Sequence, residues 1–98
     1  MKLRSISKST RDGKKWMAIF EKEDDRTKTV HFGASGYDDY TIMTDREKAE
    51  KKRSSYIRRH SKEDWSKPDT AASLSRWILW EHKSFRKAVQ EYRKKFKL

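Results

Sequence analysis

The stretch KWMAIFEKEDDRTKTVHFGASG, residues 15–36, decides the fold that the sequence predicts. Its first part, residues 15–22, reads as a strand that carries apolar side chains on both faces. One face holds Trp16, Ala18 and Phe20, and the other holds Met17 and Ile19. Apolar side chains on both faces are typical of a central strand. After a polar turn at residues 23–26, the alternation resumes over residues 27–33 and predicts the next strand.

A weaker alternation over residues 2–9 predicts one more strand ahead of this stretch. Between these two strands, residues 11–14 have Asp-Gly at their centre, which is a strong signal for a hairpin turn. Strands that are joined in succession by short turns pair as an antiparallel meander. We therefore expect a three-stranded antiparallel meander within residues 1–33.

Beyond Gly36 the spacing of apolar residues changes from two to about 3.6, the period of a helix. The pattern predicts helices over residues 45–60, 70–81 and 85–97, with Ser, Thr or Asp available to cap each one. The middle helix is the most apolar and should be central. The sequence thus predicts a single α+β domain over residues 1–98, in which an N-terminal three-stranded antiparallel meander (1–33) and a loop (34–44) are followed by three helices (45–98). The expected core is Trp16, Phe20, Val30, Phe32, Tyr56, Ile57, Leu74, Trp77, Ile78, Val89 and Tyr92.

Composition narrows the classes of protein that this chain can belong to. There is no Cys, which excludes a disulfide framework and a Cys-based zinc site and favours a reducing compartment. No apolar run approaches the about 18 residues of a membrane span, and the first residues lack the apolar core of a signal peptide. Lys and Arg number 26 against 15 Asp and Glu, for a net charge of +11. Such a field attracts nucleic acid, anionic lipid or acidic protein.

Most of this charge lies on the outer faces of the first and last predicted helices. Lys and Arg at this density can neutralise phosphates along a duplex, or they can cover a partner's acidic face. They can also form a merely solvated face whose long stems shield the apolar stripe. No helix-turn-helix, zinc-finger or basic-zipper pattern supports sequence-specific reading of bases. The candidate binding residues are Arg46, Lys48, Lys51, Lys52, Arg53, Arg58, Arg59, Arg86, Lys87, Arg93, Lys94, Lys95 and Lys97.

Catalytic and metal-binding patterns are weak by comparison. The three His, at positions 31, 60 and 82, are scattered and show no helical metal spacing. Asp38 and Asp39 are adjacent in a loop, where they more often cap backbone N–H groups than share a substrate. The run Gly33–Gly36 permits anion binding by backbone N–H groups but lacks the Lys-Ser/Thr ending of a P-loop. We expect no cofactor, no metal and no substrate-sized pocket in so small a core.

Several blocks resemble the signature of a family of short basic proteins encoded by large (nucleocytoplasmic) DNA viruses of algae and protists. They are residues 28–42, Tyr56 to His60, Trp65, Thr70-Ala71 and Ser75 to Trp80. The family has no assigned activity, so the resemblance implies a viral setting and no catalytic residues. We call residues 34–44 the signature loop. Its signature residues, with Gly33 just before it, are Gly33, Gly36, Tyr37, Asp38, Asp39 and Tyr40.

The signature residues should form one structural unit. We expect the loop to pack against the apolar middle helix. A charge-assisted pair could fix the loop there. Asp38 or Asp39 would then meet one of the cations Arg58, Arg59 and Arg76.

Together, charge and resemblance predict a non-catalytic structural component of a large DNA virus particle. It would be a small basic adaptor, either a minor capsid protein or a shell–genome linker, whose partners are larger virion proteins, DNA or both. It would reside in the virion, or in the host cytoplasm or nucleus during infection. The alternative is a sequence-nonspecific nucleic-acid-binding accessory protein. A third hypothesis, ranked below both, is a small nuclease or other enzyme built around Asp38, Asp39 and His60.

The three hypotheses predict different surfaces. An adaptor should expose an apolar patch, because apolar contact stabilises most protein interfaces. A nucleic-acid binder should carry a continuous basic stripe. An enzyme should hold a pocket in which carboxylates converge.

Overall fold

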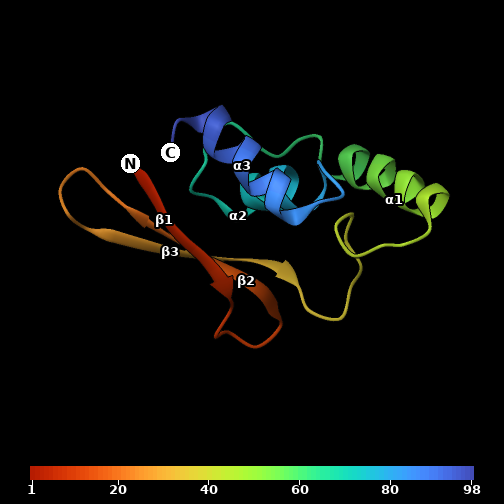
Figure 1. Cartoon of the computed structure of the whole chain (residues 1–98), viewed down its shortest axis with the longest axis horizontal. Coiled ribbons are helices and arrows are strands. Elements are labelled where there is room, and N and C mark those ends of the chain that lie inside the picture. Colours follow the sequence, from red (N-terminus) through yellow and green to blue (C-terminus); the bar gives the residue numbers. More distant parts are fainter.

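The computed structural model describes all residues 1–98 as a three-stranded sheet followed by a helical part (Figure 1). The strands are β1 (Lys2–Lys8), β2 (Lys14–Glu21) and β3 (Thr27–Ala34), antiparallel and in the order β1-β2-β3. The predicted α+β class and the meander are confirmed, and the strand with two apolar faces is the central one. The last strand runs one residue further than predicted, so Ala34 belongs to the sheet and not to the loop.

The first hairpin turn forms as its Asp-Gly pair predicts. Gly13 has a φ of +82°, a conformation that a residue without Cβ adopts without strain. The N–H of Lys14 donates to the carbonyl of Arg11 at 3.3 Å and closes the turn. This short connection sets the register in which Lys8 lies opposite Trp16.

The first and last helices lie where the sequence predicts them. Helix α1 (Arg46–Arg59) begins after Asp45, whose carboxylate accepts the N–H of Lys48 at 3.1 Å. Helix α3 (Phe85–Phe96) begins after Ser84, whose hydroxyl accepts the N–H of Lys87 at 3.2 Å.

The predicted helix over residues 70–81 forms over residues 71–79, but it changes type along its length. Helix α2 (Ala71–Leu74) is a single turn capped by Thr70, and it continues as a π-helical turn, η1 (Ser75–Leu79). The three consecutive residues Ile78, Leu79 and Trp80 are all buried. Three neighbours on a regular α-helix, which turns by about 100° per residue, do not face one surface. The change from an α-helix to a π-helical turn thus occurs where three consecutive side chains are buried.

Helices α2 and α3 lie over one face of the sheet, while α1 stands at the far end of an elongated molecule of 44 × 27 × 25 Å (Figure 1). No helix is long and apolar enough to cross a membrane. Six predicted core residues are buried, namely Phe20, Phe32, Tyr56, Leu74, Ile78 and Tyr92. The other five, Trp16, Val30, Ile57, Trp77 and Val89, are only partly buried and pack at the edge of the core.

The residues that take their place in the core are Leu3, Ala18, Tyr40, Ala49, Leu79, Trp80 and Ala88. Three of them are alanines with no exposed surface, and small residues of this kind allow elements to approach closely. Trp16, in contrast, lies at an edge of the core and stacks on Phe85, with 4.5 Å between the ring centroids. The thin core therefore keeps its small residues inside and leaves part of its large rings at the boundary.

Candidate binding groove

A groove of about 710 Å³ lies between the sheet, the signature loop and the helices α1, α2 and η1. The expectation that so small a core leaves no substrate-sized space is wrong. Helix α1 stands off from the sheet instead of packing on it, so space remains between them (Figure 1). The groove brings together the two predicted sites, because it is lined by the loop residues 36–39 and by basic residues of α1. We call it the loop groove.

The signature loop is fixed to η1, as the resemblance led us to expect. The N–H of Tyr40 donates to the carbonyl of Leu79 at 3.0 Å. At the start of the loop, Gly33 has a φ of +80°, and a Cβ there would lie 2.9 Å from Cδ1 of Leu79. Only glycine therefore permits this close approach of the chain to Leu79.

The acidic residue of the loop meets a different cation from those expected. The carboxylate of Asp39, 3% exposed, lies 2.7 Å from Nζ of Lys15. Its other oxygen accepts the N–H of Thr41 at 2.9 Å and also the Thr41 hydroxyl. Asp38 is exposed and makes no ion pair. The predicted pairing of Asp38 or Asp39 with an arginine is thus wrong.

The three expected arginines are placed elsewhere. Arg58 and Arg59 are exposed on α1, while Arg76 is buried beside Glu81, with 3.1 Å between Nη1 and Oε1. Lys15, and not an arginine, pairs with Asp39 because of the register of the sheet. Its neighbour Lys14 lies opposite Ala34, at the start of the signature loop, so Lys15 lies next to the loop.

Glu81 joins α1 to η1. It accepts hydrogen bonds from Arg76 and from Nη2 of Arg53, whose Nε donates to the carbonyl of Trp80 at 2.8 Å. Burial raises the pKa of Glu81, but the two guanidinium groups outweigh it and leave the pKa below its usual value. Arg53, predicted as a binding residue, is therefore part of the helix–helix contact.

An aromatic stack forms the α1 side of the loop groove. The ring of Tyr56 lies between His60, at 4.2 Å, and Trp80, at 4.7 Å between centroids. Burial is the main cause that raises the pKa of Tyr56, to about 12. Lys52, Tyr56 and Arg59 all line the groove, and their spacing of four and three residues places them on one face of α1.

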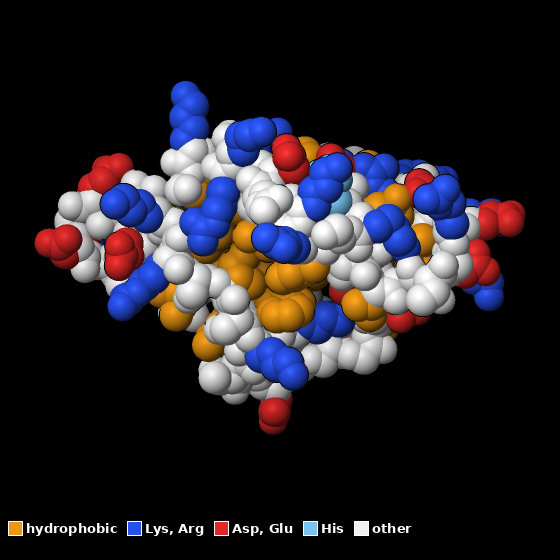
Figure 2. All heavy atoms as spheres, in the orientation of Figure 1, with side chains coloured by type: hydrophobic (Ala, Val, Ile, Leu, Met, Phe, Trp, Pro, Cys, Tyr) orange, Lys and Arg blue, Asp and Glu red, His pale blue; other side chains and the backbone are white.

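Eleven predicted cations are exposed, and Lys and Arg side chains gather over α3 and α1 on the face that Figure 2 shows. Two of the thirteen are not free for a partner: besides Arg53, Nη1 of Arg93 donates to the carbonyl of Leu3 at 2.9 Å. Lys95 lies 4.3 Å above the ring of Trp77, and Lys51 is 3.9 Å from Glu47. The exposed cations without such contacts are Arg46, Lys48, Lys52, Arg58, Arg59, Arg86, Lys87, Lys94 and Lys97.

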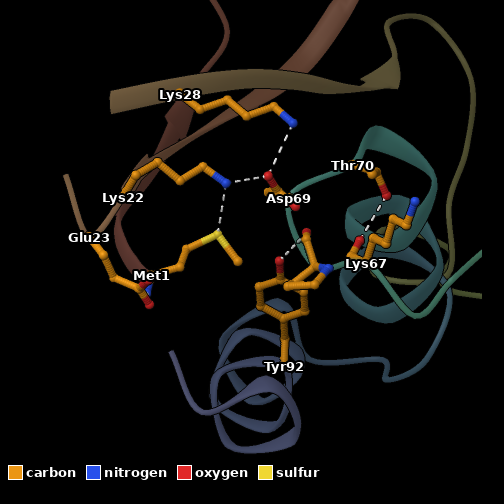
Figure 3. A network of polar contacts seen from close by, with 9 residues as sticks. Met1, Lys22, Glu23, Lys28, Lys67, Asp69, Thr70 and Tyr92 are labelled. Carbon is orange, nitrogen blue, oxygen red and sulfur yellow. Dashed lines mark hydrogen bonds and ion pairs between the residues drawn. The ribbon is translucent and has the colours of Figure 1, made fainter. Parts of the chain in front are cut away.

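A second polar cluster, which the sequence did not indicate, ties the sheet to the helical part. Lys22 and Lys28 reach from the β2–β3 hairpin to Asp69, at 2.5 and 3.1 Å, while Tyr92 of α3 donates to the carbonyl of Pro68 (Figure 3). The hydrogen bond from Lys22 is the main cause that lowers the pKa of Asp69, to about 2. The cluster is a structural clamp, because every charge in it is paired within the chain.

The residues of the enzyme hypothesis share the loop groove without converging. Asp38, Asp39 and His60 all line it, but Asp39 is held by Lys15, and Nδ1 of His60 lies 2.7 Å from Glu63. No three His, Asp or Glu side chains are grouped so that they could hold a metal ion. Of the other histidines, His31 is hydrogen-bonded to the hydroxyl of Ser9 at 2.7 Å.

Comparison with known proteins gives one match. A family of unknown function (DUF5754) matches residues 4–60, more than half of the chain. The matched part comprises the sheet except for the first two residues of β1, together with the signature loop and α1. It overlaps the blocks of the resemblance over residues 28–60. No curated protein and no solved structure matches the chain.

Proposed function

The chain belongs to a family of unknown function (DUF5754), and we propose that it is a non-catalytic structural adaptor that binds an acidic partner through the outer faces of α1 and α3. The resemblance to short basic proteins of large DNA viruses favours a virus particle as its setting. There it would link shell proteins to one another or to the genome.

The observation that carries this proposal is that α1 is mostly exposed and strongly basic. Its 14 residues contribute only Ala49 and Tyr56 as buried residues. Most of its cations are exposed and have no partner within the chain, so packing of the core does not account for them. Charges that fold stability does not need remain available for a partner, and at this density they favour an acidic surface.

Exposed apolar side chains on the signature loop supply the second element that an adaptor requires. Tyr37 is 73% exposed and Ile42 is 57% exposed, and they are the large hydrophobic residues with the greatest exposure. Aromatic and aliphatic side chains at the surface often act as anchors in protein interfaces. A protein partner could therefore contact the loop while its acidic groups meet α1.

Mass spectrometry of purified virus particles, separated into shell and core fractions, tests the proposed setting. The chain should be present in the particle and should remain with one fraction after detergent treatment. Its absence from particles, in cells where infection produces the chain, would contradict a structural role.

A second candidate is a sequence-nonspecific nucleic-acid-binding protein. The unpaired cations over α1 and α3 favour it, because phosphate contacts need charge and no particular motif. Affinity for duplex DNA should then fall linearly with salt on a logarithmic scale, with a slope of about −0.9 per phosphate contacted. If no DNA binds at low salt, this candidate is excluded and the protein adaptor remains.

A further inference from the structure

We propose that the loop groove binds a single-stranded segment of nucleic acid, with one base stacked on Tyr37 and its phosphates on Lys52 and Arg59. The inference rests on the second candidate function and adds to it a site and a type of strand. The carrying observation is that an exposed aromatic ring and unpaired cations from two separate parts of the chain line one concave surface.

The cations of the groove are placed to follow a phosphate chain. Lys52 and Arg59 lie on the same face of α1, seven residues apart, which is roughly 10.5 Å along the helix axis. Lys14 lines the groove from β2. All three are exposed and have no ion pair within the chain. A bound strand would therefore not have to displace an internal partner.

The acidic residues of the groove do not cancel this charge. Asp39 is neutralised by Lys15, and Glu63 lies beside His60. Asp38 and Glu63 are the carboxylates of the lining that have no lysine or arginine partner. The three unpaired cations Lys14, Lys52 and Arg59 outnumber them, so the groove attracts anions.

Tyr37 supplies a surface for stacking. The two tyrosines of the loop differ sharply, because Tyr40 is 9% exposed and Tyr37 is 73% exposed. Tyr40 belongs to the core and donates to Glu50, whereas Tyr37 makes no hydrogen bond. An exposed ring beside cations is the combination by which proteins hold single strands, because every base has a flat face and every nucleotide a phosphate.

The size of the groove favours a single strand over a duplex. A cavity of about 710 Å³ is comparable to the pocket of a small ligand, and it can admit a few unstacked groups. A double helix, whose major groove alone is about 12 Å wide, can only lie across the outside. An acidic polypeptide would meet the same cations, but it brings carboxylates and no flat rings to Tyr37.

Fluorescence anisotropy with a labelled oligothymidylate of about 10 nucleotides tests the inference. A blunt duplex of equal length and a polyglutamate peptide serve as the other two probes. Substitution Tyr37→Ala should weaken binding of the single strand about tenfold or more, whereas Tyr37→Phe should retain it. Duplex binding should change by less than about twofold in both variants. Because Tyr37 is exposed, circular dichroism and the melting temperature of the variants should equal those of the original protein.

Removal of charge gives an independent readout on the same probe. Lys52→Gln and Arg59→Gln should each reduce the salt slope for the single strand by about 0.7, the value for one phosphate contact. Lys2→Gln on β1, an exposed lysine outside the groove and outside the candidate cations of α1 and α3, is the matched control and should leave that slope unchanged.

Each opposing outcome has a distinct meaning. If Tyr37→Ala binds the single strand as well as the original protein does, the inference is wrong, while binding that depends on α3 would still support the second candidate. If the original protein binds no nucleic acid at low salt, the second candidate and the inference both fail. If polyglutamate binds more tightly than the oligonucleotide and its binding depends on Tyr37, the groove is a peptide site and the inference is wrong.

Discussion

Nζ of Lys15 lies 2.7 Å from the carboxylate of Asp39, and this pair ties the signature loop to the central strand of the sheet. The same carboxylate holds the N–H of Thr41. Because Asp39 is almost completely buried, a neutral replacement that cannot accept these bonds leaves buried polar groups without partners.

Asp39→Ala should therefore destabilise the protein by about 2–4 kcal/mol. Asp38→Ala is the matched control, since Asp38 is exposed, and it should change the free energy of unfolding by less than about 0.5 kcal/mol. Urea denaturation followed by tryptophan fluorescence measures both. Equal losses for the two variants would show that the Lys15–Asp39 pair does not fix the loop.

Gly33→Ala tests the contact between the loop and η1. The substitution combines an unfavourable φ of +80° with a Cβ only 2.9 Å from Leu79, and it should cost about 2–3 kcal/mol. Gly36→Ala is the control, because its φ of +82° is equally unfavourable but its Cβ would meet nothing within 4 Å. It should cost about 1 kcal/mol. A loss for Gly33→Ala no greater than that for Gly36→Ala would mean that Leu79 moves aside freely.

Acid should weaken the clamp at Asp69. The lysines hold the folded-state pKa of Asp69 at about 2, below the usual value of 3.8. A depressed pKa gives stability that is present above about pH 4 and is lost as the pH falls toward about 2. The lowered pKa of Asp69 contributes of the order of 2 kcal/mol to the free energy of unfolding, since one pKa unit corresponds to about 1.4 kcal/mol.

Asp69→Asn is the variant that isolates this effect. It should be less stable than the original protein at pH 6, and the difference should shrink as the pH approaches 2. Urea denaturation at a series of pH values gives the comparison. A difference that stays constant from pH 6 to pH 2 would show that ionisation of Asp69 contributes nothing.

The sheet and two of the helices could be predicted because local patterns determine them. The alternation of Trp16, Ala18 and Phe20 defines a strand, and Asp45 and Ser84 begin helices by bonding to N–H groups three residues away. Such signals lie within a few residues of the structure that they determine, so a single sequence contains them.

The loop groove could not be predicted, because it depends on contacts between distant parts of the chain. Lys15 meets Asp39 only through the register of β2 and β3, and Arg53 meets Glu81 only because α1 lies beside the end of η1. The sequence did contain one signal that Arg53 differs from the other cations of α1. Arg53 lies one helical turn before the apolar residue Tyr56, and in the structure both contact Trp80. Charge alone does not distinguish such a residue from its exposed neighbours.

The last prediction separates these two kinds of arginine on α1. Arg53→Ala should destabilise the protein by about 1.5–3 kcal/mol, because Glu81 and the carbonyl of Trp80 lose a charged donor. Arg58→Ala, five residues further along the same helix, should change stability by less than about 0.5 kcal/mol, because Arg58 is exposed and makes no ion pair.

For DNA binding, the larger effect should come from Arg58→Ala and not from Arg53→Ala. If duplex DNA is bound across the outer face of α1, Arg58→Ala should reduce the salt slope by about 0.9, the value for one lost phosphate contact. Arg53→Ala, measured at a temperature where it is fully folded, should leave the slope unchanged, because Arg53 is already engaged within the chain. A loss of slope in Arg53→Ala and none in Arg58→Ala would place the bound surface at the α1–η1 contact and contradict the assignment of the exposed cations to the partner.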